Sequence, residues 1–184
     1  IDEGLVGSEM CIRDRGRDIL NKGGNAFDAA CAVSFMLGVV EPQMSGIGGD
    51  GFIMMFDKSD NKVSVINATG PAPEFSNKID KHLSFKSIKS TSVPGLVSGV
   101  IKMHKLKGNI SLQECMEPSI KAASEGVPLS EDQSYSLTKE SEINKFPSSM
   151  KIWGKENGYY KFGDNIINKD LALTLDKISL KGSL

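Results

Sequence analysis

Apolar and polar positions along the chain separate one long apolar segment from several amphipathic ones. Residues 26–40 are apolar on almost every side, which predicts a helix that other elements cover all round. Asn25 is a good N-cap residue, and Asp28 places a carboxylate in the first turn, close to a capping box. The helix is expected to end at Glu41, because a residue that precedes proline is disfavoured in the α region.

The next segment has the two-residue period of β-structure. Residues 52–56 form a continuous apolar run, which is typical of a strand buried on both faces. Residues 62–67 alternate between apolar and polar, and a polar turn lies between the two runs. The pattern therefore predicts a β-hairpin.

Helical patterns account for most of the remaining chain. Five segments have helical spacing or capping signals: 16–22, 93–106, 111–125, 130–142, and a last one that begins at Asn168 or Asp170. Residues 146–165 have no regular period and are expected to be loop-like. The order of elements predicts an α+β fold with the sheet and helices in layers.

Composition excludes several classes of function. The chain has 22 basic and 23 acidic residues, so no bulk charge favours nucleic acid or an anionic membrane. No apolar run reaches the roughly 18 residues that span a bilayer. Cys31 and Cys115 lie in helical patterns and are expected to be buried apolar residues, while His82 and His104 have no metal-ligand spacing. We therefore expect neither a metal nor a cofactor.

Residues 1–15 lack helical or strand periodicity and are expected to be a disordered leader or non-native cloning sequence, although an unusual natural tail is the alternative. The native N-terminus is then expected to be absent. Localisation consequently stays open between a periplasmic or secreted protein and a cytoplasmic one. Residues 16–184 are treated as the folded part.

Two glycine-rich motifs carry a resemblance to a known family. Gly23-Gly24-Asn25-Ala26-Phe27-Asp28-Ala29-Ala30 is followed by Glu41-Pro42-Gln43-Met44-Ser45-Gly46-Ile47-Gly48-Gly49-Asp50-Gly51-Phe52. Segments further on agree in the same order: Ser92-Val93-Pro94-Gly95, Met103-His104, Pro118-Ser119-Ile120, and Asn168-Lys169-Asp170-Leu171-Ala172. Together they resemble the N-terminal part of the large subunit of γ-glutamyltranspeptidases, which are N-terminal-nucleophile hydrolases.

The resemblance implies an αββα sandwich, present here only as an incomplete fragment. It also implies a precursor that cuts itself into large and small subunits and exposes a Thr nucleophile whose own α-amine acts as the base. That Thr would lie beyond this chain, so no catalytic residue is expected in it and the fragment is expected to be inactive. Its implied partners are the remainder of the precursor, including the small subunit, and a small γ-glutamyl or other amide substrate.

One position departs from the family pattern. In γ-glutamyltranspeptidases an Arg just before the Ala-Pro that follows the second strand pairs with the substrate α-carboxylate. Alignment on Ala72-Pro73 places Thr69 there, and a Thr has no charge to offer a carboxylate. Thr69 is therefore the candidate substrate-binding residue. Unless a neighbouring basic residue replaces the Arg, the substitution favours acylase-type amide hydrolysis over γ-glutamyl transfer.

Two classes of function stay open at this stage. The first is a self-processing amidohydrolase of the γ-glutamyltranspeptidase type. The second is a non-catalytic homologue of the same fold that serves as a structural or binding subunit. The sequence that follows this chain, with or without a Thr at the junction, distinguishes them.

Overall fold

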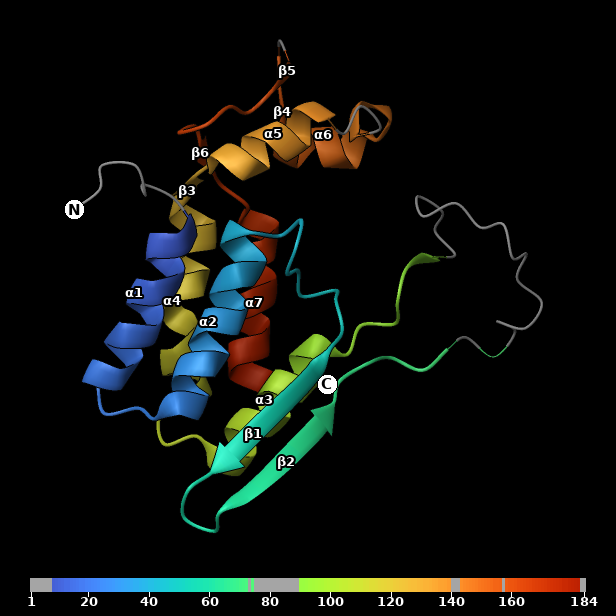
Figure 1. Ribbon diagram of the computed structural model, residues 1–184. Helices are drawn as coiled ribbons and strands as arrows, with labels where there is room; N and C mark the ends of the chain where they lie inside the picture. Colours follow the sequence, from blue (N-terminus) through green and yellow to red (C-terminus); the bar gives the residue numbers. More distant parts are fainter. Residues whose placement is uncertain (1–7, 73, 75–89, 140–142, 157, 183–184) are drawn as a thin grey trace.

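The computed structural model describes residues 8–72, 74, 90–139, 143–156 and 158–182. A group of long helices and one β-hairpin form the main body, and a smaller lobe of short elements lies across one end of it (Figure 1). The main body contains α1 (Ser8–Asn21), α2 (Ala26–Val40), β1 (Phe52–Asp57), β2 (Lys62–Asn67), α3 (Leu96–Lys107), α4 (Leu112–Glu125) and α7 (Lys169–Lys181). The mixture of helix and strand confirms the predicted α+β class.

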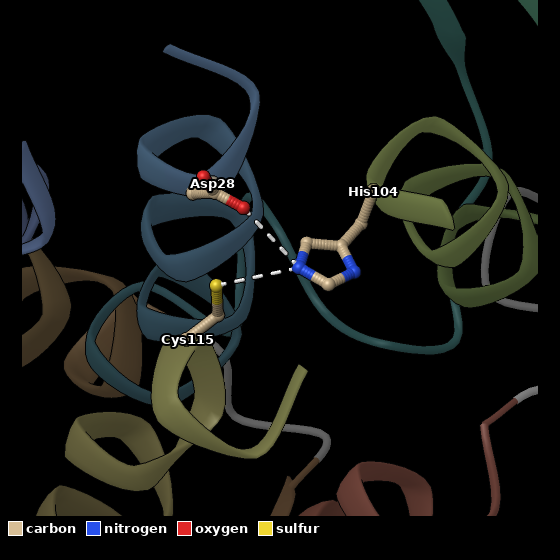
Figure 2. A group of neighbouring side chains, drawn as sticks. All are labelled: Asp28, His104 and Cys115. Atoms are coloured by element: carbon tan, nitrogen blue, oxygen red, sulfur yellow. Dashed lines mark hydrogen bonds and ion pairs between the residues drawn. The ribbon is translucent and has the colours of Figure 1, made fainter. Parts of the chain in front are cut away.

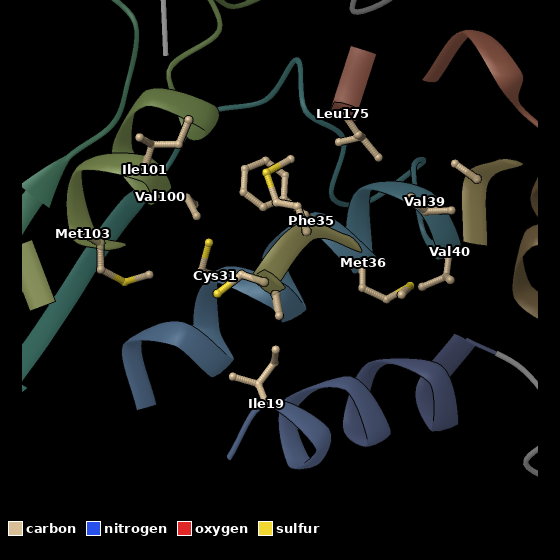
Figure 3. Packing of buried hydrophobic residues seen from close by; sticks show 14 of the residues in the cluster. Ile19, Cys31, Phe35, Met36, Val39, Val40, Val100, Ile101, Met103 and Leu175 are labelled. Carbon is tan, nitrogen blue, oxygen red and sulfur yellow. The ribbon is translucent and has the colours of Figure 1, made fainter. Parts of the chain in front are cut away.

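Helix α2 is the centre of the main body, as its all-round apolar pattern predicts. It packs against α1, α3 and α4, and buried side chains from all of these helices meet around it (Figure 3). Phe35 and Met36 are almost fully enclosed, and Leu175 reaches the same core from α7. Complete burial of a side chain of this size contributes roughly 1.5–3 kcal/mol, so the enclosure of α2 is a main source of stability.

The predicted hairpin is confirmed, with antiparallel pairing from Phe52↔Asn67 to Asp57↔Lys62. Its burial differs from the prediction, because only one face is covered in this chain. Met55 and Ile66 point into the core beside α3, whereas five large side chains on the other face are exposed: Phe52, Met54, Phe56, Val63 and Val65. The hairpin thus forms a two-stranded sheet that has one buried face and one exposed apolar face.

An ion pair joins the turn end of the hairpin to the last turn of α3. Lys107 Nζ donates a hydrogen bond to Asp57 Oδ2. This bond, together with bonds from Ser59, lowers the pKa of Asp57 well below its ordinary value, and the same bond to Asp57 raises the pKa of Lys107. The pair therefore holds the hairpin against α3 over the whole neutral range.

The first helix begins eight residues earlier than the prediction of 16–22. Residues 8–15 of the expected leader are helical, and Cys11 and Ile12 pack against the main core. Helices α1 and α2 lie close together there, because a Cβ on Gly16 would lie only 3.3 Å from Val33 Cγ2 of α2. A packed contact with α2, rather than local periodicity, accounts for this segment. The origin of residues 1–15 stays a prediction.

The segment expected to be a loop between 146 and 165 is more regular than predicted. Together with the stretch before it, it forms the smaller lobe: β3 (Val127–Pro128), α5 (Glu131–Lys139), η3 (Ile143–Lys145), α6 (Pro147–Trp153), β4 (Gly154–Lys155), β5 (Gly158–Tyr159) and β6 (Asn165–Ile166). Leu129, Leu137 and Ile166 form its separate core. These elements are too short for a period to be read from sequence, so only tertiary packing reveals them.

The other predicted helices are confirmed, although α3 begins at Leu96 rather than at Val93. Helix α4 begins with the capping box of Ser111 and Glu114, and α7 begins after Asn168, the first of the two candidate N-caps. Helix α5 lies inside the predicted range of 130–142, whose last three residues are outside the described part, as is His82. Among the described residues, no helix has both the length and the apolar character needed to cross a membrane.

The open face of the hairpin generates a prediction about this chain on its own. We expect residues 16–184, expressed alone, to aggregate or to be molten, because a large apolar surface faces water. Met54→Lys is expected to raise the soluble fraction, since Met54 is 76% exposed, while Met55→Lys is expected to lower it, since Met55 is 6% exposed. Soluble fraction and gel filtration of the two variants measure the difference. A soluble, cooperatively melting monomer of the unmodified chain would contradict the prediction.

Candidate functional site

A polar network at the beginning of α2 is buried in an otherwise apolar body. Asn25 Oδ1 accepts hydrogen bonds from the N–H groups of Phe27 (2.8 Å) and Asp28 (3.1 Å), and Asn25 N–H donates to Asp28 Oδ2 (2.8 Å). The predicted capping box is therefore complete. A carboxylate in the first turn is also stabilised by the helix dipole.

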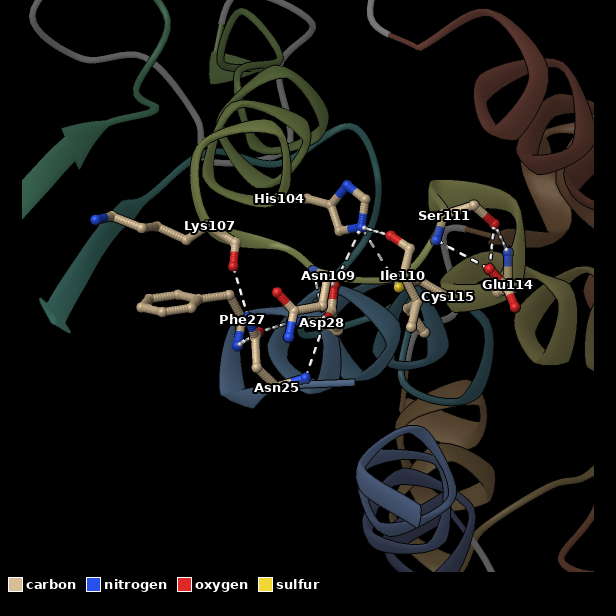
Figure 4. A network of polar contacts seen from close by, with 10 residues as sticks. All are labelled: Asn25, Phe27, Asp28, His104, Lys107, Asn109, Ile110, Ser111, Glu114 and Cys115. Atoms are coloured by element: carbon tan, nitrogen blue, oxygen red, sulfur yellow. Dashed lines mark hydrogen bonds and ion pairs between the residues drawn. The ribbon is translucent and has the colours of Figure 1, made fainter. Parts of the chain in front are cut away.

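The same carboxylate reaches a segment more than 80 positions away. The N–H of Asn109, in the turn between α3 and α4, donates to both oxygens of Asp28 (3.1 and 3.0 Å), and Asn25 Nδ2 donates to Lys107 O (2.6 Å) (Figure 4). His104 Nε2, on the last turns of α3, lies 3.3 Å from Asp28 Oδ1. Asp28 is fully buried, and these donors replace the water that its charge would otherwise require.

Cys115 completes a cluster of three potential metal ligands. Its Sγ lies 3.7 Å from the same His104 nitrogen that faces Asp28, and the three donor atoms lie within 4.8 Å of one another (Figure 2). That nitrogen also lies 3.0 Å from Ile110 O. Because a carbonyl and a carboxylate only accept hydrogen bonds, Nε2 is assigned the hydrogen and is not a free ligand. The cluster is therefore a hydrogen-bond network that fastens α2, α3 and α4 together.

The Cys31 thiol remains protonated. A hydrogen bond with Cys115, and then burial, raise the pKa of the Cys31 thiol far above its ordinary value. Both side chains are fully enclosed in the core. They serve as small buried residues, as predicted, and are not nucleophiles.

A second candidate region lies at the open end of the hairpin, where three segments of the chain contact one another. Ala68, just after β2, exchanges two backbone hydrogen bonds with Gly51 of the glycine-rich loop (2.9 and 3.3 Å). The carbonyl of Gly49 accepts bonds from the N–H groups of Gly95 and Leu96 at the start of α3, both at 3.1 Å. The glycine-rich loop is thus used for close contact between backbones.

Glycine is required at two points of this contact. A Cβ on Gly95 would lie 2.1 Å from Ala68 O, and a Cβ on Gly70 would lie 2.0 Å from Val93 O. Both distances are far below van der Waals contact with backbone atoms that cannot move aside. The segment around Thr69 is therefore held tightly between β2 and the start of α3.

Thr69 lies at this meeting point and is half-buried. Its N–H and its hydroxyl both donate to Asn67 Oδ1, at 2.9 and 2.6 Å. The Asn67 side chain therefore sets the direction of the Thr69 hydroxyl, which keeps its lone pairs as acceptors. The position therefore has a fixed neutral hydroxyl and no positive charge.

Sequence reasoning placed Asp28 in a cap and His104 on a helix as a packed or surface residue. It did not bring them together. The available signal was weak: a carboxylate and a histidine, each on a helix whose other face is apolar. Their pairing depends on how α2 and α3 cross, and no local spacing encodes that.

Solved structures of related proteins show the class to which this fold belongs. The γ-glutamyltranspeptidase of Helicobacter pylori matches with a TM-score of 0.83 and 31% identity, over 99% of this chain and 56% of that one. The cephalosporin acylase of Bacillus halodurans matches with a TM-score of 0.81 and 26% identity, over 92% of this chain and 34% of that one. The fold is therefore that of the γ-glutamyltranspeptidase and acylase class.

Sequence comparison identifies the family itself. Residues 13–184 match the Gamma-glutamyltranspeptidase family model. The glutathione hydrolase proenzyme of Bacillus subtilis is 34% identical over 178 residues, which cover 91% of this chain and 30% of the relative. The chain thus spans about a third of the length of the curated relatives that it matches. It belongs to the γ-glutamyltranspeptidase family.

The buried carboxylate generates a stability prediction for the full-length protein that contains this chain. Asp28→Ala leaves the N–H groups of Asn25 and Asn109 without an acceptor, and it leaves His104 Nε2 with the carbonyl of Ile110 alone. We expect the free energy of unfolding to fall by about 3 kcal/mol or more, measured by urea denaturation. Asp132→Ala removes an exposed carboxylate from the first turn of α5 and should cost no more than about 0.5 kcal/mol. Equal effects of the two variants would contradict the assigned role.

Proposed function

We propose that this chain is the N-terminal part of the large subunit of a self-processing amidohydrolase. The observation that carries the proposal is the match to the family over residues 13–184, together with a chain length of about a third of the matched proenzymes. The remaining two thirds would then contain the other strands of an αββα sandwich. Those strands would cover the open apolar face of β1 and β2.

The reaction proposed for the full-length protein uses an N-terminal Thr exposed by self-cleavage. Its hydroxyl attacks the carbonyl carbon of an amide while the α-amine takes the hydroxyl proton, which gives an acyl-enzyme and releases the amine. Water or an acceptor amine then takes the acyl group and regenerates the Thr. The chain described here would contribute the scaffold and one side of the substrate site, and would be inactive alone.

The neutral side chain of Thr69 favours a substrate whose acyl group has no charged carboxylate. Its side chain is neutral, and its hydroxyl is already oriented by Asn67. A bidentate cation is the group that best recognises a carboxylate, and Thr69 cannot replace it. We therefore favour acylase-type hydrolysis over γ-glutamyl transfer, and the similarity to a cephalosporin acylase agrees with this preference.

The first test is self-cleavage of the full reading frame. We expect one precursor band on a denaturing gel to convert with time into two bands, with a Thr at the new N-terminus by sequencing. Replacement of that Thr by Ala should leave the precursor intact. A single stable band in the unmodified protein would overturn the enzymatic proposal in favour of a non-catalytic homologue of the same fold.

The second test concerns Thr69 and substrate choice in the processed protein. Thr69→Arg adds a cation at the end of the sheet and is expected to raise kcat/KM for γ-glutamyl-p-nitroanilide about tenfold or more, because a charge-assisted pair with the α-carboxylate becomes available. Phenylacetyl-p-nitroanilide has no such carboxylate, so its kcat/KM should not rise.

Thr174→Arg is the matched control. Thr174 is an exposed residue of α7 whose hydroxyl, like that of Thr69, is bound locally, in this case to Asp170 O. The control should leave both rates unchanged. An equal change for both substrates in Thr69→Arg, or no change for either, would show that Thr69 does not face the substrate carboxylate position.

A further inference from the structure

The smaller lobe contains a cavity that the proposed reaction does not use. It has a volume of about 300 Å³ and lies between the segment that follows α2 and the elements α5, η3 and α6. Most of its walls are apolar or uncharged side chains, among them Pro42, Gln133, Ser136, Leu137, Ile143 and Trp153. A volume of this size matches the lower end of sites for small molecules.

One polar side chain in this wall is held in a single orientation. Gln133 Oε1 accepts a hydrogen bond from Ser130 N–H (3.0 Å), and Gln133 N–H donates to Ser130 Oγ (3.2 Å). This reciprocal pair is a capping box at the start of α5. Because the oxygen of the amide is engaged with the backbone, the amide nitrogen is directed away from the cap.

That nitrogen has no hydrogen-bond partner among the residues that the structure describes. Gln133 is only 6% exposed and lines the cavity, and its NH₂ group is not fully enclosed. A water molecule bonded to that group can be displaced by a ligand oxygen, which then takes over the hydrogen bond. The NH₂ group therefore favours a ligand that has an oxygen acceptor.

The other walls specify the rest of the ligand. Trp153 offers an aromatic surface, and Leu137 and Ile143 offer aliphatic ones. Among the residues that the structure describes, no charged side chain lines the cavity, so an ionised carboxylate or phosphate would find no opposite charge there. We propose that this cavity binds a small uncharged molecule that has an aromatic or branched aliphatic group and one carbonyl oxygen, which accepts a hydrogen bond from Gln133 Nε2.

The test uses three probes of nearly the same shape on the full-length protein. Acetophenone has the carbonyl, isopropylbenzene replaces that oxygen by a methyl group, and benzoate replaces the methyl group by a charged oxygen. None has a bond that an amidohydrolase cleaves. By ligand-observed NMR titration, we expect acetophenone to bind with a Kd of about 1 mM or lower, and the other two to bind about fivefold more weakly or worse.

Two variants locate the binding. Gln133→Glu keeps the oxygen that caps α5 but replaces the donor by a second oxygen, and it should weaken acetophenone binding about tenfold or more. Gln113→Glu makes the same change on the exposed surface of α4 and should bind like the unmodified protein. Ser136→Trp fills the cavity and should also abolish binding, so it decides the matter if Gln133→Glu does not fold.

Each outcome of these titrations either supports or overturns the proposal. Acetophenone binding that is lost in Gln133→Glu and Ser136→Trp, and kept in Gln113→Glu, supports the proposal. No binding of acetophenone, binding that the cavity variants leave unchanged, or an equal preference for isopropylbenzene would overturn it. Binding of acetophenone elsewhere in the full-length protein would also overturn the proposal, because the cavity variants would leave that binding unchanged.

Discussion

The rest of the main body depends on the buried carboxylate of Asp28. An ionised group without water must have its lone pairs satisfied by protein donors, and here these come from the cap of α2, the turn after α3, and His104. Three elements are consequently fixed in relation to one another by one charge. The apolar core around α2 contributes most of the burial energy, but apolar contacts have no direction, whereas this network fixes how α2, α3 and α4 are placed.

Because this network fixes α3, it also fixes the hairpin and the candidate substrate position, which both contact α3. At one end of α3, Lys107 holds the turn of the hairpin through Asp57. At the other end, the first N–H groups of α3 hold Gly49 of the glycine-rich loop. Thr69 lies between that loop and the helix, so its neutral hydroxyl is presented by a rigid scaffold rather than by a free loop.

The two polar groups proposed above to contact small molecules are both uncharged. Thr69 offers a hydroxyl oriented by Asn67, and Gln133 offers an amide nitrogen oriented by the cap of α5. Both are fixed by local hydrogen bonds, which lowers the entropy lost when a ligand binds. Both proposals therefore favour uncharged groups over carboxylates as ligands.

Local signals in the sequence were sufficient for the capping boxes at Asn25 and Ser111, the enclosure of α2, and the hairpin, because each depends on contacts a few residues apart. Tertiary structure alone decided that Asp28 meets His104 and Asn109, since no spacing encodes a contact across 81 positions. It also decided that residues 8–15 are helical, that short elements form a second lobe, and that Gln133 lines a cavity. These features depend on packing between elements, whose geometry arises only when the whole chain has folded.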